Sequence, residues 1–187
     1  MKNRCSWVKL DSSLSVHYHD NEWGVPCFND NKLFEMLILE GAQAGLSWQT
    51  VLKKRENYRK AFDNFNPKKI SKYQNSKIQE LLSNSGIIRN KLKINSAINN
   101  AKVFLNIQKE LGSFSNYIWS FTDNKVIKNN FENYNNTPTK TELSDSISKD
   151  LKNRGMTFVG STIIYAYLQA IGVVNNHQMD CFCRMRR

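Results

Sequence analysis

Apolar residues recur at intervals of three and four residues along most of the chain, and no other feature constrains its fold as strongly. The longest such stretch runs from Ile94 to Leu105, places its apolar side chains on one helical face, and stops at Gly112. Further helices are expected to begin at Asn29 or Asp30, after Ser47, at Pro67, near Ile78, at Ser144 and at Ser161. No strands alternate with these segments, so a parallel sheet is not expected and the predicted fold class is all-α.

The length of the chain bounds the number of domains. A chain of 187 residues is expected to form a single domain over residues 1–187, with its central helical part at about 30–120. One segment, Asp123–Glu142, is rich in Asn and Thr and contains Pro138. This composition predicts a long surface loop.

The balance of charge favours a polyanionic partner. Lys and Arg total 27 and Asp and Glu total 16, so the formal net charge is +11. A small basic protein most often binds nucleic acid, although such a charge can also serve solubility alone. No signal peptide follows Met1, and the longest apolar stretch, Ile163–Val174, is shorter than a membrane span. We therefore expect a cytoplasmic protein without a membrane partner.

Cysteine and histidine residues gather near the two ends of the sequence. The segment from His177 to Cys181 places a nitrogen and a sulfur ligand four residues apart, and Cys5 and His19 supply a second pair. Two Cys and two His complete a tetrahedral shell for Zn²⁺ with no open position. Such a site joins the N- and C-terminal segments, so its expected role is structural.

Spacing alone does not fix this ligand set. His17 can replace His19, and Cys183 can replace Cys181. Cys27 is interpreted as a free thiol. Because the spacing is not that of a zinc finger, a simpler interpretation is two buried thiols and two surface imidazoles.

Residues 151–166 carry two glycines between two predicted helices. The helix that begins at Ser144 ends at Gly155, and the next begins at Ser161, directly after Gly160, and runs to about Ile171. Free backbone N–H groups at such a helix start can bind a phosphate group. Basic residues precede the turn: Lys149, Lys152 and Arg154. This is the form of a helix–hairpin–helix, which holds DNA by its backbone, although a simple turn with a glycine cap has the same pattern.

Aromatic residues accompany one acidic residue in the first part of the chain. Glu40 follows an apolar helix face, and Trp7, Tyr18, Trp23 and Trp48 lie in the same part of the sequence. Aromatic rings around a carboxylate suit a flat, cationic ligand that donates hydrogen bonds. Each tryptophan alone is better explained as core, but four aromatic residues near one acid favour a ligand pocket.

Several long motifs along the chain match one known family in the same order. They are Arg4–Trp7, Tyr18–Pro26, Leu33–Gly41, Gln43–Trp48, Val51–Glu56, Gly86–Ile94, Phe158–Ile163, Gln169–Ala170, Val174–His177 and Cys181. These motifs resemble the 3-methyladenine DNA glycosylase I family of helix–hairpin–helix glycosylases. The resemblance spans nearly the whole chain, from Cys5 to Cys181.

The resemblance implies an activity and a set of metal ligands. The family flips 3-methyladenine out of alkylated double-stranded DNA and hydrolyses its N-glycosidic bond, which leaves an abasic site. Its structural zinc ligands correspond to Cys5, His19, His177 and Cys181. No lysine stands out as a Schiff-base nucleophile, so we expect hydrolysis without strand cleavage.

The resemblance also implies where the base binds. Glu40 corresponds to the catalytic residue, Tyr18 and Trp48 to residues that bind the base, and Trp7 and Trp23 to residues that line the pocket. Aromatic stacking favours the electron-poor ring of an alkylated base, and a carboxylate can accept hydrogen bonds from its amino group. Whether Glu40 also orients the attacking water is left open.

DNA contacts are expected at two places. Gly45 and Leu46 match the segment that probes the gap left by the flipped base. The hairpin, with Gly155, Gly160 and Ser161, is expected to hold the phosphate backbone. A monomer is expected.

Three positions deserve separate interpretation. The family often has Asn-Asp before the third metal ligand, and this chain has Asn175-Asn176 before His177. The change from Asp to Asn176 is expected to affect the hydrogen bonds that support the zinc ligands. Leu92 replaces a common glycine, and Asp180 is interpreted as a support of the zinc loop and not as a catalytic group.

The competing function is a non-catalytic, zinc-stapled DNA-binding protein, which has no need of Glu40 among aromatic residues.

Overall fold

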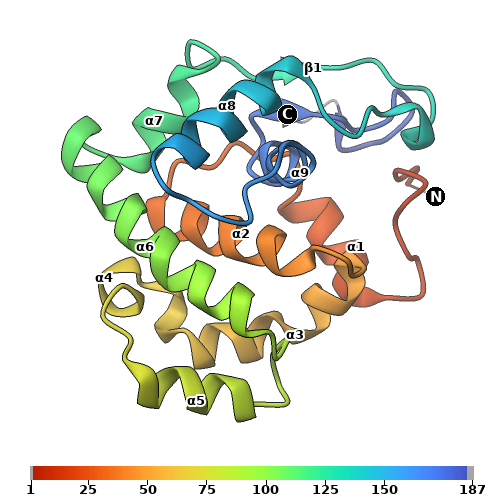
Figure 1. The fold of residues 1–187 in the computed structure, drawn as a ribbon. Coiled ribbons are helices and arrows are strands. Elements are labelled where there is room, and N and C mark those ends of the chain that lie inside the picture. The colour runs from red at the N-terminus through yellow and green to blue at the C-terminus, as the bar shows by residue number, and fades with distance from the viewer. Residues whose placement is uncertain (1, 185–187) are drawn as a thin grey trace.

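The computed structural model describes residues 2–184, and helix α2 (Asp30–Gln43) runs through its middle (Figure 1). Every residue from Leu33 to Ala42 is buried, which is typical of a helix that other elements surround. Its helical neighbours are α3 (Trp48–Ala61), α6 (Lys91–Leu111), α7 (Phe114–Ser120) and α9 (Ser161–Ala170). This arrangement is consistent with the predicted all-α fold class.

Side-chain caps start helices where the sequence predicts them. Asn29 Oδ1 accepts a hydrogen bond from Lys32 N at 3.0 Å, and Ser47 Oγ accepts one from Thr50 N at 3.2 Å, at the N-termini of α2 and α3. Gly112, whose φ is +83°, ends α6 as expected. The two short helices predicted after α3 are present as α4 (Pro67–Ile70) and α5 (Asn75–Ser83).

The helix pair predicted near the C-terminus is present, with one boundary corrected. Helix α8 (Glu142–Asn153) begins before Ser144, because Thr141 is the N-cap and Ser144 occupies the third helical position of a capping box. Helix α9 begins at Ser161, as expected, and ends at Ala170.

Two helices and one sheet were not predicted. The sequence of α1 (Ser13–Asn21) is mostly polar and shows no apolar stripe, and α7 is short. The expectation of no parallel sheet is wrong in one small place, because β1 (Ile127–Lys128) pairs in parallel with β2 (Val174–Asn175). Strands of two residues are too short to leave an alternating pattern in the sequence.

The Asn-rich segment, residues 123–142, is irregular over most of its length. It contains β1 and one 3₁₀ helix, η2 (Tyr134–Asn136). A second 3₁₀ helix, η1 (Asp63–Phe65), follows α3.

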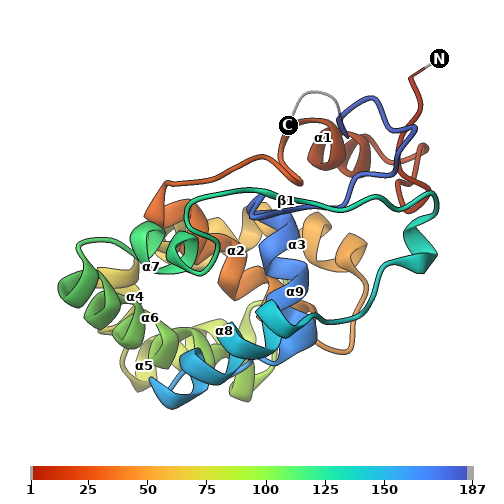
Figure 2. The ribbon, with the colours of Figure 1, turned by 90° about the horizontal axis from the view of Figure 1, so that it is seen from above.

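The N- and C-terminal segments lie side by side (Figure 2). Phe182 N donates a hydrogen bond to Asn3 O at 3.0 Å, and one cluster of buried apolar side chains extends from Cys5 to Cys183. Within residues 2–184, no helix is both long and apolar enough to cross a lipid bilayer.

Candidate active site and metal centre

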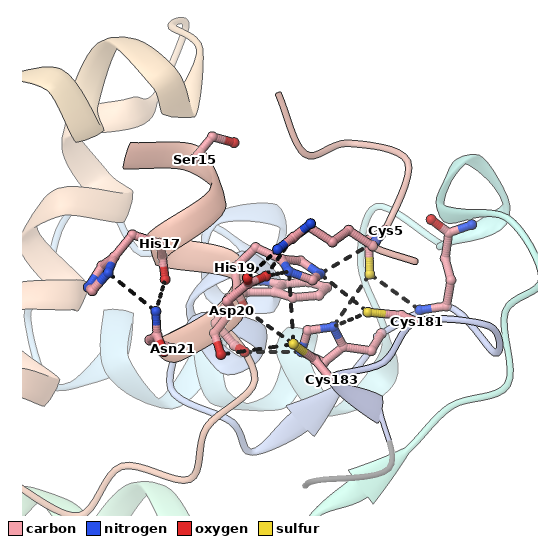
Figure 3. A network of polar contacts seen from close by, with 12 residues as sticks. Cys5, Ser15, His17, His19, Asp20, Asn21, Cys181 and Cys183 are labelled. Carbon is pink, nitrogen blue, oxygen red and sulfur yellow. Dashed lines mark hydrogen bonds and ion pairs between the residues drawn. The ribbon is translucent and has the colours of Figure 1, made fainter. Parts of the chain in front are cut away.

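Two cysteines and two histidines from opposite ends of the sequence meet in a buried cluster (Figure 3). Cys181 Sγ lies 3.4 Å from both His19 Nε2 and His177 Nδ1, and Cys5 Sγ lies 3.4 Å from His177 Nδ1. Around a tetrahedral zinc ion, a sulfur and a nitrogen ligand are roughly 3.5 Å apart. The four side chains therefore fit one metal ion; we call them the metal cluster.

The remaining ring nitrogens of the metal cluster are occupied by other partners. His19 Nδ1 lies 2.8 Å from Asp20 Oδ1, and Arg4 holds the same carboxylate with bonds of 2.8 and 2.7 Å. His177 Nε2 lies 3.1 Å from the carbonyl oxygen of Trp23. Such contacts fix the ring orientation of metal-binding histidines, and they direct the other nitrogen of each ring toward the two sulfurs.

Hydrogen bonds also favour a thiolate in the metal cluster. The thiol of Cys5 and then the rings of His177 and His19 hydrogen-bond to Cys181, and they lower the pKa of its thiol. A thiolate is the form in which cysteine binds a metal ion.

The alternatives left open by the sequence lie elsewhere. His17 is exposed and lies 3.2 Å from Asn21 Nδ2. Cys183 is buried, but its Sγ lies 4.0 Å from His19 Nδ1, the nitrogen that faces Asp20 and not the metal cluster. Cys27 is half-buried, with its Sγ 3.9 Å from the carbonyl oxygen of Asn29.

The expected role of Asn176 needs a correction. Its side chain is buried and bonds to Asn129 Nδ2 and Tyr165 OH, both at 2.8 Å, and to none of the four ligand side chains. It therefore fastens the Asn-rich segment to α9. Asp180, beside the last ligand, is exposed.

A cavity of about 300 Å³ lies close to the metal cluster. The structure brings together around it all of the residues that the sequence assigned to the base pocket. The cavity, here called the aromatic pocket, is lined by Trp7, Tyr18, Trp23, Glu40, Trp48, Tyr134 and Gln169, together with Lys9, Ser15, Gln43, Ser47, Gln49 and Ala166. Ring centroids are 5.0 Å apart for Trp7 and Trp23 and 5.1 Å apart for Tyr18 and Trp48. These rings offer several apolar faces to a flat ligand.

Glu40 is a buried acid without a protein partner. Its side chain lies near the C-terminal end of α2, the residue is 4% exposed, and it makes no hydrogen bond or ion pair with the residues that the structure describes. Burial raises the pKa of Glu40 to about 8. Its carboxyl group therefore holds a proton at neutral pH until a ligand supplies a positive charge or hydrogen-bond donors.

The raised pKa of Glu40 predicts a pH-dependent stability. Between pH 4.5 and pH 8 the folded protein keeps a proton that the unfolded chain releases, so the free energy of unfolding falls as the pH rises. We expect Glu40→Gln to remove this dependence and to gain stability relative to the wild type by about 1 kcal/mol for each pH unit in this window. Denaturant unfolding of both proteins at pH 5 and pH 8 tests this; equal pH slopes would contradict it.

Two residues that line the aromatic pocket, Gln169 and Tyr134, were not predicted from the sequence. Gln169 is 4% exposed, its Nε2 donates to Tyr165 O at 3.3 Å, and its Oε1 has no partner among the described residues. Tyr134 comes from the Asn-rich segment, whose composition indicated only a surface loop. Gln169 belongs to the motif Gln169–Ala170, which matches the family, and this match is the sequence signal that could have identified it as a site residue.

The hairpin between α8 and α9 is held by polar side chains. Asn100 Nδ2 and Ser96 Oγ donate to the carbonyl oxygen of Thr157 at 2.8 and 3.1 Å, and Ser148 Oγ donates to that of Val159 at 2.6 Å. The N-cap of α9 provides no side-chain hydrogen bond, so the first N–H groups of this helix are available to an anion.

The loop after α2 faces the start of α9. A cavity of about 210 Å³ separates them, and its lining includes Glu40, Gly45, Leu46 and Thr162. Gly45 has a φ of +76°, which side-chain-bearing residues rarely adopt, and Leu46 is 42% exposed. Glu40 therefore borders both this cavity and the aromatic pocket, which places the candidate DNA contacts beside the candidate base site.

The basic residues before the hairpin differ in availability. Lys149 and Lys152 are exposed. Arg154 is already paired, because it bonds to Glu110 at 2.7 Å and to Asp150 at 2.8 Å. Leu92, the replaced glycine, is 69% exposed at the start of α6.

Cavity size alone does not select the site. A cavity of about 370 Å³ lies around Cys27 and Phe28, on another part of the surface. The charged groups that line it, Glu22 and Lys32, bond to each other at 2.8 Å. Among its lining residues, this second cavity therefore has no buried, unpaired acid such as Glu40 in the aromatic pocket.

Comparisons with known proteins agree with this geometry. The family model for methyladenine glycosylase matches residues 7–184. The chain belongs to the methyladenine glycosylase family. Among methyladenine glycosylases, it is 48% identical over 184 residues to the DNA-3-methyladenine glycosylase of Haemophilus influenzae, with 98% of this chain and 99% of the relative covered. It is 47% identical over 180 residues to the DNA-3-methyladenine glycosylase 1 of Escherichia coli K12, with 96% of each covered.

The fold of this methyladenine glycosylase is also similar to a solved structure with a ligand. A crystal structure of a 3-methyladenine DNA glycosylase I variant in complex with 3-methyladenine matches it with a TM-score of 0.93. The two chains are 32% identical, and 97% of each is covered. An identity of 32% over nearly all of both chains shows that the two proteins share a family as well as a fold.

Proposed function

We propose that this protein is a DNA glycosylase that removes 3-methyladenine from alkylated DNA. The observation that carries the proposal is Glu40, a buried acid that lies among aromatic rings and has no partner within residues 2–184. The relatives named above act on, or bind, the same base. A non-catalytic DNA-binding protein needs no such pocket.

The chemistry follows from the charge of the alkylated base. Methylation at N3 leaves the nucleotide base cationic and weakens its glycosidic bond, so the C1′–N9 bond breaks and the base leaves as neutral 3-methyladenine. Water adds to C1′ of the sugar and releases one proton to solvent. Tyr18 and Trp48 stack on the electron-poor ring. Entry of the cation favours release of the proton from Glu40, whose carboxylate then accepts hydrogen bonds from the amino group of the base.

We expect hydrolysis without strand cleavage. A lysine nucleophile is activated by desolvation or by a neighbouring cation. Lys9 lines the aromatic pocket but is exposed, so burial does not activate it as a nucleophile.

The base must leave the duplex before it reaches Glu40. The N–H groups at Gly160 and Ser161, with the turn at Gly155, are proposed to hold phosphates of the DNA. Leu46, which projects from the loop at Gly45, is proposed to fill the space that the base vacates.

Leu46→Ala tests this role of the loop. Without the side chain the empty stack is not filled, so we expect the rate of base release from duplex DNA to fall about tenfold. Affinity for free 3-methyladenine should not change, because Leu46 does not line the aromatic pocket. Leu111→Ala, a change of a similarly exposed leucine at the end of α6, is the control. An unchanged rate with duplex DNA would remove Leu46 from the mechanism.

The metal cluster is proposed to hold Zn²⁺ through Cys5, His19, His177 and Cys181. Four protein ligands leave no open position, so the ion would stabilise the joined terminal segments without taking part in the reaction. The buried core is continuous from Cys5 to Cys183, which supports one domain over the described part of the expected range 1–187, and we expect the protein to act as a monomer.

The proposed function is tested by base release. Purified protein is incubated with methylated DNA, and the released bases are separated against authentic 3-methyladenine and 7-methylguanine. We expect release of 3-methyladenine. Binding of the DNA without any release of base would favour the zinc-stapled binding protein instead.

A further inference from the structure

The wall of the aromatic pocket includes a residue from the Asn-rich segment. Tyr134, in η2, lies against Trp7 and Trp23, with ring centroids 6.2 and 6.1 Å apart. Burial, and then the nearby carboxyl of Glu40, raise the pKa of Tyr134 to about 12, so its phenol stays protonated. Its hydroxyl makes no hydrogen bond with the residues that the structure describes.

The segment that carries Tyr134 is fastened to the C-terminal part of the chain on its N-terminal side. Gln178 Nε2 donates to Glu132 O at 2.9 Å, and Met179 N donates to Phe131 O at 3.0 Å. Asn133 caps η2 by accepting from Asn135 N at 2.9 Å.

Gln178 lies within the loop of the metal cluster, between two of its ligands. Its side chain also accepts a hydrogen bond from the backbone N–H of Ser6, next to Cys5. The metal cluster and the segment of Tyr134 therefore share one set of hydrogen bonds. Because the residues just before Tyr134 are fixed in this way, its ring is held at the pocket and need not be recruited by a ligand.

Building on the proposed function, we propose that Tyr134 is a base-contacting residue that strengthens binding of 3-methyladenine, through its ring face and its free hydroxyl. Tyr18, Trp48 and Glu40 then contact the base from the helical side of the pocket, and Tyr134 contacts it from the Asn-rich segment. An aromatic face and one neutral donor add affinity without opposing the positive charge of the base.

The test compares Tyr134→Ala and Tyr134→Phe with the wild type. Dissociation constants for free 3-methyladenine are measured by calorimetry, and kcat and KM for base release are measured on methylated DNA. Asn136→Ala, an exposed change in the same 3₁₀ helix, is the matched control. Thermal unfolding of each variant shows whether the fold is retained.

We expect Tyr134→Ala to weaken binding of the free base about tenfold and to raise KM, while Asn136→Ala behaves as the wild type. Tyr134→Phe, which keeps the ring and loses the hydroxyl, should weaken binding less than Tyr134→Ala does, and wild-type affinity of Tyr134→Phe would remove the hydroxyl from the proposal. A folded Tyr134→Ala variant with wild-type affinity would overturn it, while wild-type base release would leave the proposed function standing. No base release by the wild type would overturn both.

Discussion

Glu40→Gln is expected to lower the rate of 3-methyladenine release by about 100-fold, which is the size of effect when one well-placed electrostatic group is lost. The amide keeps the shape of the side chain but cannot become negative when the cationic base enters. It also presents an N–H group where the amino group of the base needs an acceptor. Single-turnover release of 3-methyladenine from methylated DNA measures the effect.

The control for this prediction is another neutralised acid. Glu80→Gln changes an exposed carboxylate on α5 that pairs with Lys77 at 2.7 Å, and it should release base at the wild-type rate. Near-normal release by Glu40→Gln would show that the negative charge is dispensable and would leave stacking as the source of selectivity.

Cys5→Ser is expected to lower the melting temperature by more than about 10 °C, because a structural zinc site contributes several kcal/mol and each kcal/mol is worth about 2–4 °C in a domain of this size. The loss frees the N-terminal segment from His177 and Cys181 at the other end of the chain. Thermal unfolding gives the stability, and metal analysis of the purified protein gives the zinc content.

Cys27→Ser provides the matched control for the metal cluster. This thiol is half-buried, hydrogen-bonds to the carbonyl oxygen of Asn29, and belongs to no candidate ligand group among residues 2–184. Its replacement should leave the zinc content at one ion per chain and shift the melting temperature little. Equal stability of Cys5→Ser and Cys27→Ser would argue against a structural metal ion.

Much of the fold could be predicted because its helices carry regular apolar faces and clear caps. Helices α2, α3 and α6 combine both signals, and Asn29, Ser47 and Gly112 mark their ends. Helix α1 has a serine cap, Ser12, but no apolar stripe, because its buried residues, Ser15, Tyr18 and His19, serve the pocket and the metal cluster. Because these site residues occupy its buried face, the sequence of α1 lacks the apolar periodicity from which a helix is predicted.

The candidate site was predicted unevenly for a similar reason. Scarce residue types pointed to the metal cluster, but spacing could not tell Cys181 from Cys183, because the choice depends on which nitrogen of His19 each sulfur faces. Tyr134 gave no signal, since its neighbours in sequence are asparagines and only the fold brings its ring to Trp7. A residue on an irregular segment has no periodicity from which its direction can be inferred.

The measurement that tests the central claim most directly is a crystal structure of the protein with 3-methyladenine. We predict that the base occupies the aromatic pocket, stacks on Trp48 or Tyr18, and donates its amino group to Glu40. Binding of the base in the cavity around Cys27, or no binding in either cavity at saturating concentration, would contradict the account.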